Sequence, residues 1–120
     1  MLTEKTNDAA FLKELQHAFA TAQPYKHVVI DDFLDVLFAQ ALAEKFPLLE
    51  NMKTRYNGIN EKKAEHSELN SLSPEFNNLK NLLFDEGFIQ RIKQISGIEN
   101  LEVFDDRFDY GLHQGGNGAF

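Results

Sequence analysis

The sequence predicts an α+β domain whose β-sheet is incomplete within this chain. Apolar residues recur at helical spacing in four segments before residue 97, whereas strand-like alternation appears mainly after residue 100. One earlier run, His27–Ile30, is short and β-branched, which is typical of a strand. Helices followed by strands indicate segregated helical and sheet layers. The strands near residues 101–114 need more pairing partners than residues 27–31 can supply, so we expect an unfinished sheet.

The first helix is predicted over residues 8–22, where apolar residues follow the i, i+3, i+4, i+7 spacing of one helical face. Asp8 or Asn7 is expected to cap its start, because short polar side chains accept hydrogen bonds from the first turn. Gln23-Pro24 is expected to end it, since proline disfavours helical geometry in the residue before it.

Three further helices are predicted from their start and stop signals. One is expected to begin after Asp35 as its N-cap and to end at Pro47. The next begins at Ser73-Pro74-Glu75, which combines a capping serine, a proline in the first turn and an early acid. The last covers roughly residues 87–96 and is followed by Gly97, a natural residue for a left-handed helix end.

Residues 48–72 are mostly polar and carry little periodicity. Asn57-Gly58 indicates a turn, and Arg55-Tyr56 is expected to begin a short edge strand. We expect the remainder to be a long loop, and loops of this length without their own structure are often functional or mobile.

The composition limits the classes of function that fit. The chain has 120 residues and 42% hydrophobic residues, which is enough for one modest hydrophobic core. Its net charge of −7 makes nucleic acid a poor partner, because an acidic surface repels phosphates. It has no cysteine, and no apolar run approaches the length of a membrane helix. We find no signal peptide and therefore expect a soluble, cytoplasmic protein with no membrane or nucleic-acid partner.

Several short segments, taken in order, resemble one enzyme family. "PYKHVVIDDFL" at residues 24–34 precedes a helix that ends in Phe46-Pro47. Ser96-Gly97-Ile98 follows the later helices. Gly111–Gln114 reads "GLHQ", and Gly118–Phe120 follows in a glycine-rich context. This order resembles the N-terminal part of an Fe(II)/2-oxoglutarate-dependent oxygenase of the prolyl 4-hydroxylase-like group. Two aspartate-containing pairs depart from the family pattern, at Asp105-Asp106 and at Asp109-Tyr110.

The resemblance implies a double-stranded β-helix, or jelly roll, with the N-terminal helices packed on its first strands. Residues 1–23 would form an N-terminal helix and residues 24–120 the first part of the oxygenase-like domain. The implied parent activity is hydroxylation of a prolyl or similar side chain in a protein or amino-acid substrate, with Fe(II) and 2-oxoglutarate as cofactors. The resemblance places the iron-binding His-x-Asp beyond Phe120. We therefore expect a fragment that is inactive alone and binds neither cofactor by itself.

Three residues are the candidates for a cofactor or substrate cleft. The resemblance places Tyr110, His113 and Gln114 near the mouth of the cleft, in the strand before the iron-bearing strand. A supporting role in the strand is the alternative for all three. Asp109 and His113 are four residues apart and would share one face of a strand, so they could form half of a metal site. Two ligands are too few for a metal centre, however.

The remaining polar clusters have structural interpretations that compete with functional ones. Asp31-Asp32 and Asp105-Asp106 could share a proton, but both pairs border expected strand ends, where aspartate commonly forms turns. His27 is expected to make a structural hydrogen bond. Gly115–Gly118 lacks the lysine of a phosphate-binding loop and is explained by turn chemistry. Four residues of the long loop could flank a substrate entrance or could simply be solvated: Arg55, Tyr56, Lys62 and Lys63.

A second interpretation of the whole chain is a non-catalytic, acidic α+β module that binds another protein. An open sheet edge invites pairing. Such a module would cover its unpaired edge with a partner or with a second copy of itself. Self-association through an open sheet edge is therefore an expectation under this interpretation.

Overall fold

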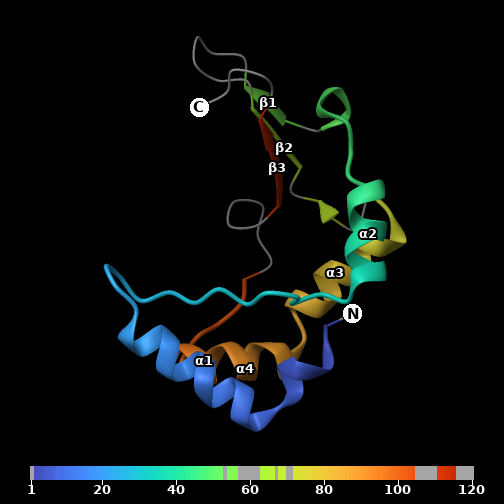
Figure 1. Ribbon diagram of the computed structural model, residues 1–120. Coiled ribbons are helices and arrows are strands. Elements are labelled where there is room, and N and C mark those ends of the chain that lie inside the picture. The colour runs from blue at the N-terminus through green and yellow to red at the C-terminus, as the bar shows by residue number, and fades with distance from the viewer. Residues whose placement is uncertain are drawn as a thin grey trace. The chain divides into compact units, whose positions relative to one another are not determined.

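The structure is a computed structural model that describes residues 2–52, 54–56, 63–66, 68–69, 72–104 and 111–115. Within these ranges the chain is mainly helical (Figure 1). The helical elements are η1 (Glu4–Asn7), α1 (Ala9–Thr21), α2 (Val36–Glu44), η2 (Leu49–Asn51), α3 (Pro74–Leu83) and α4 (Glu86–Ser96). The strands are β1 (Thr54–Tyr56), β2 (Lys63–His66) and β3 (Leu112–Gly115). None of the described helices is long and apolar enough to cross a membrane.

The predicted fold class is wrong. We expected an α+β domain with helices on the first strands of an incomplete double-stranded β-helix, but the described residues are mostly helical. The three strands are only three or four residues long. The expected strands at His27–Ile30 and Leu101–Val103 are not strands, and residues 108–110 lie outside the described ranges.

The physical reason for this error is visible at residues 27–30. Val28 and Ile30 are half-buried and pack against a cluster formed by Leu12, Leu15 and Ile95. Val29, between them, is 75% exposed. The alternation that predicted a strand is therefore present as alternating burial, but helices rather than neighbouring strands cover the apolar face.

All four predicted helices are confirmed, and so are the predicted caps, but the second helix ends at Glu44 rather than at Pro47. The Asp8 carboxylate accepts from the backbone N–H of Ala10 at 3.2 Å, and Asp35 accepts from Phe38 at 2.9 Å. Ser73 Oγ accepts from the Phe76 N–H at 3.3 Å, and Asp85 caps α4. Gly97 follows α4 with a φ of 73°, a left-handed conformation that favours glycine.

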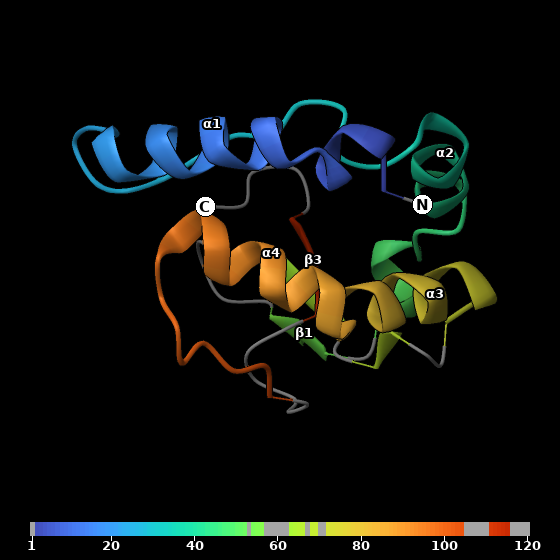
Figure 2. The ribbon, with the colours of Figure 1, turned by 90° about the horizontal axis from the view of Figure 1, so that it is seen from below.

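The chain divides into two compact units, which we describe separately. The first unit contains Met1–Ala41 and Asn81–Val103. In it, α1 and α4 lie side by side (Figures 1 and 2) and bury Leu12, Leu15 and Ile95 between them. The rings of Phe33 and Phe88 are 6.0 Å apart and extend this core. Apolar burial between two helices is thus the main stabilising contact of the first unit.

In the first unit, the N-terminal residues form hydrogen bonds with residues 31–33, which follow the extended residues 27–30. The backbone N–H of Thr3 donates to the carbonyl of Phe33 at 3.1 Å, and its hydroxyl donates to the carbonyl of Asp32 at 2.7 Å. Leu2 and Leu34 form an isolated antiparallel bridge. Lys5 Nζ donates to the carbonyl of Asp31. These hydrogen bonds hold the turn at residues 31–32, from which the chain continues toward α2.

The second unit contains Leu42–Lys80 and Phe104–Phe120. Its described core includes Met52, Ala64, Leu69 and Phe76, each less than 5% exposed. The Phe46 and Phe76 rings pack edge to face at 6.2 Å. The sheet order is β1-β2-β3, with both pairings antiparallel.

The expected edge strand at Arg55-Tyr56 is confirmed as part of β1. The expectation that the rest of residues 48–72 would be loop is wrong at Lys63–His66, which form the central strand β2. This strand has no apolar alternation in its sequence. Ala64 supplies its fully buried position, and a single small residue gives little periodicity signal.

Candidate functional site

The candidate cleft residues that the structure describes lie on β3. His113 pairs in register with Glu65 of β2, and Gln114 pairs with Ala64. Successive residues of a strand point to opposite faces, and accordingly His113 is exposed whereas Gln114 is half-buried. The two residues therefore do not converge on one face of the sheet. Tyr110, the third candidate, lies outside the described residues, as does Asp109.

Gln114 has an unusual environment for a strand residue. Its side-chain oxygen Oε1 is buried and has no hydrogen-bond partner within the described part of the chain. Gln114 is paired across the sheet with Ala64 of β2, which is completely buried. A second buried acceptor without a partner in the described part of the chain, the carboxylate oxygen Oε2 of Glu75, lies in the first turn of α3 in the same unit. Leaving such an acceptor unpaired costs about 1–3 kcal/mol, so both positions would gain from a donor.

The paired aspartates near the first unit's turn have structural roles. Asp31 and Asp32 form a turn, in which Asp32 has a positive φ of 51°. Their backbone carbonyls accept from Lys5 and Thr3, as described above. Both residues are exposed. The turn interpretation fits this geometry, and Asp105-Asp106 lies outside the described residues.

The other residues considered in the sequence fall in ordinary positions. His27 is exposed, and its Nδ1 lies 2.8 Å from the Tyr25 carbonyl, which is a local structural hydrogen bond. Arg55 and Tyr56 lie on β1, and Lys63 begins β2, so they belong to the small sheet rather than to a loop. Lys62 and residues 116–118 lie outside the described ranges.

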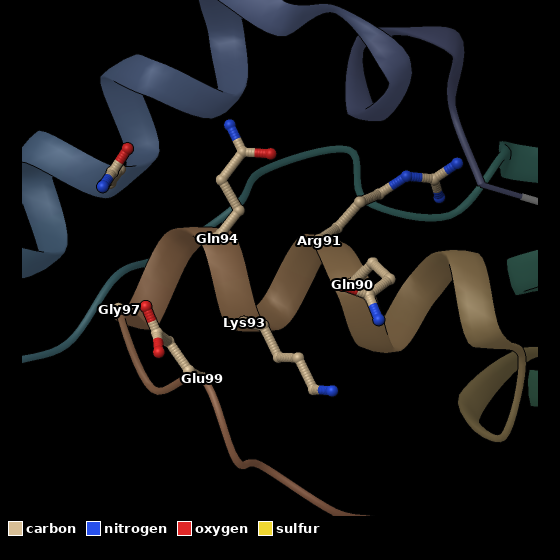
Figure 3. A pocket seen from close by; sticks show the side chains of 7 residues that line it. Gln90, Arg91, Lys93, Gln94, Gly97 and Glu99 are labelled. Atoms are coloured by element: carbon tan, nitrogen blue, oxygen red, sulfur yellow. The ribbon is translucent and has the colours of Figure 1, made fainter.

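A polar pocket lies on the first unit, and the sequence did not predict it. Its volume is about 510 Å³, and it is formed by one residue of α1 and by the end of α4 (Figure 3). Its lining residues are Gln16, Gln90, Arg91, Lys93, Gln94, Gly97 and Glu99. The only sequence signal for this pocket is the row of polar residues on α1 and α4. Such positions occur on every surface helix, so they carry little information about a site.

The side chains of this pocket do not converge on a common point. In Figure 3, Gln94 points toward α1, whereas Lys93 points to the opposite side of α4. Arg91 is engaged with the Asn7 side chain, and the Gln90 amide donates to Glu86 at 2.8 Å. The pocket offers cations, amides and one carboxylate to a polar ligand. It contains no nucleophile held by a base, which is the arrangement that covalent catalysis needs.

A second cavity in the first unit is apolar and too small for a cofactor. Its free volume is about 10 Å³, and it lies inside the core between α1, α4 and the segment around Phe33. A space of this size is at the lower limit for a single water molecule. It represents ordinary packing of the α1–α4 core.

Fe(II) and 2-oxoglutarate are the cofactors that the resemblance implies. The described part of the chain holds no group of three or more His, Asp or Glu side chains that could bind a metal ion. A catalytic iron of this kind needs two histidines and one carboxylate.

Comparisons with known proteins did not identify a relative of this chain. No protein-family model matches the chain, and neither the curated proteins nor the solved structures yield a match.

Proposed function

We propose that this chain is an N-terminal segment of a 2-oxoglutarate/Fe(II)-dependent dioxygenase whose activity is hydroxylation of a prolyl or similar side chain. The proposal rests on the order of the motifs described above. The chain itself would supply outer helices and part of the rim of the cleft. It would not supply the metal ligands.

The observation that carries this proposal is the position of β3. The strand contains Leu112, His113 and Gln114 of the "GLHQ" motif, and it is an edge of the β1-β2-β3 sheet. The family resemblance requires another strand directly after this motif. An edge strand has a row of backbone groups that can accept such a neighbour.

The buried Gln114 oxygen supports the same proposal. Within the described residues this acceptor has no donor, whereas nearly all buried polar groups in proteins are satisfied. A strand or cofactor added beside β3 would bring new donors near this side chain. Gln114 would then belong to the rim of a cleft that further residues complete.

An activity assay tests the proposal. The native polypeptide that carries this sequence, isolated from its source, would be incubated with Fe(II), 2-oxoglutarate and proline-containing peptides. We expect succinate formation that requires iron, and no succinate from residues 1–120 alone. Succinate formed by the 120 residues alone would contradict the assignment of the ligands to another part of the protein. An iron-loaded native polypeptide that never consumes 2-oxoglutarate would contradict the family assignment.

A further inference from the structure

Residues 27–30 form an extended segment that ends at the turn of Asp31 and Asp32. The segment runs along α1 and emerges on the side of α1 that faces away from α4 (Figures 1 and 2). Within the described residues, the backbone groups of Val28 and Ile30 make no hydrogen bond. The Asp31 carbonyl is engaged by Lys5. Because backbone groups of alternate residues point to opposite edges of an extended chain, the Lys5 contact lies on the edge of Val29, and the edge of Val28 and Ile30 carries no hydrogen bond within the described residues.

The side chains of this segment are arranged as in a half-covered strand. Val28 and Ile30 pack on the core of α1 and α4, whereas Val29 is 75% exposed. Tyr25, just before the segment, is 69% exposed. An unpaired extended edge beside exposed apolar side chains is a site for addition of another strand.

We propose that a second copy of this chain occupies the open edge, by antiparallel pairing of the two segments about a twofold axis at Val29. In this register Val29 faces the partner's Val29, and Val28 faces the partner's Ile30. His27 then lies beside the partner's Asp31, the first residue of the turn that ends the segment. Two copies of each hydrogen-bonded pair form, because the axis repeats every contact.

Charge and polarity select this register over its neighbours. Lys26 and His27 precede the apolar core of the segment, and Asp31 and Asp32 follow it. Centring the axis on Val29 matches apolar with apolar side chains and places the basic end of each copy beside the acidic end of the other. A centre at Val28 would set His27 opposite Val29. A centre at Ile30 would set Val29 opposite Asp31.

The faces of the paired segments are also consistent. A twofold axis perpendicular to two antiparallel strands keeps equivalent side chains on the same face. Val28 and Ile30 of both copies would continue to cover their own helical cores, while both Val29 side chains would meet on the outer face. The interface is small, so we expect a weak, concentration-dependent dimer.

Disulfide trapping gives the sharpest test, because the chain has no cysteine of its own. Directly opposed residues that do not exchange hydrogen bonds have Cα atoms about 4.5 Å apart, within disulfide range. Val29→Cys should form a disulfide-linked dimer on mild oxidation. Leu37→Cys, at a position that is also 75% exposed in the first unit, is the matched control and should remain largely monomeric. Equal cross-linking of both variants, or none at Val29, would refute the proposed register.

Sedimentation velocity with charge variants tests the same interface without cross-linking. The unsubstituted chain should show a monomer–dimer equilibrium. Val29→Lys should weaken dimerisation at least about tenfold, because like charges would face each other across the axis, whereas Leu37→Lys should leave it unchanged. His27→Asp should weaken the dimer as well, and the exchange His27→Asp/Asp31→His should restore it. A monomer at every concentration, or failure of the exchange to restore association, would overturn the proposal.

Discussion

Gln114 is the described candidate-site residue whose surroundings depart most from ordinary packing. Its buried Oε1 lacks a donor, whereas exposed His113, its neighbour, faces away from it on the other side of β3. The sequence placed both residues on a strand, and that prediction is confirmed. Their opposite faces follow from the strand period, but the unsatisfied oxygen could not be predicted. It depends on which residues of distant segments cover the sheet.

Gln114→Met tests whether the buried Oε1 of Gln114 lacks a hydrogen-bond donor in the 120-residue chain. Methionine has a similar length and removes the buried acceptor, so the variant of residues 1–120 should be more stable by about 1 kcal/mol. If the proposed dioxygenase continues after Phe120 and supplies a donor to Gln114, the same change in that polypeptide should destabilise it. Urea denaturation measures both effects, with exposed Gln94→Met as the control. Destabilisation already in the 120-residue chain would show that the amide is satisfied without additional residues.

Gly97 illustrates a residue whose role was fully predictable. Its φ of 73° is a conformation that β-carbons disfavour, and a Cβ at this position would meet no atom within 4 Å. Steric clashes therefore contribute nothing to the effect of substitution.

We expect Gly97→Ala to lower the free energy of unfolding by about 1–2 kcal/mol, from backbone strain alone. Gly97→Asn should cost less, because asparagine tolerates the left-handed region. Thermal and urea unfolding of the two variants would measure the difference. An alanine variant as stable as the unsubstituted chain would contradict the assigned conformation.

At the scale of elements, the helices were predictable because their signals are local. Caps such as Asp8 and Ser73, and the apolar stripes behind them, act within one or two turns. The strands were less predictable. The alternation at Val28–Ile30 correctly indicates one buried and one exposed face, but it cannot tell whether a helix or another strand covers the buried face. Lys63–His66 lacks a pattern and was missed.

The contact between α1 and α4 should dominate the stability of the first unit. Leu15 is 6% exposed and lies in the cluster with Leu12 and Ile95. Leu15→Ala should destabilise by about 2–5 kcal/mol, through lost burial and the cavity left behind. Gln16→Ala, on the exposed side of the same helix, should change stability by less than about 0.5 kcal/mol. Chemical denaturation followed by circular dichroism would compare the two, and equal effects would contradict the packing of α1 on α4.

At the scale of the whole molecule, the sequence predicted the order of the helices and not the fold class. The expected jelly roll came from a family resemblance and not from the periodicity of the residues themselves. Sheets depend on long-range pairing, which local sequence patterns do not specify, and the described residues are mostly helical. The candidate site shares this limitation. Two of its three residues are placed on β3, and the groups that would face them are not among the described residues.

The central claim is that residues 1–120 belong to a 2-oxoglutarate/Fe(II)-dependent dioxygenase. Reading the native transcript past the codon for Phe120 tests it most directly. We expect the reading frame to continue into a His-x-Asp within a few residues, followed further on by a second histidine and an arginine or lysine. A frame that continues without this motif, or a stop codon directly after Phe120, would contradict the claim and leave the segment at Val29 as the feature to pursue.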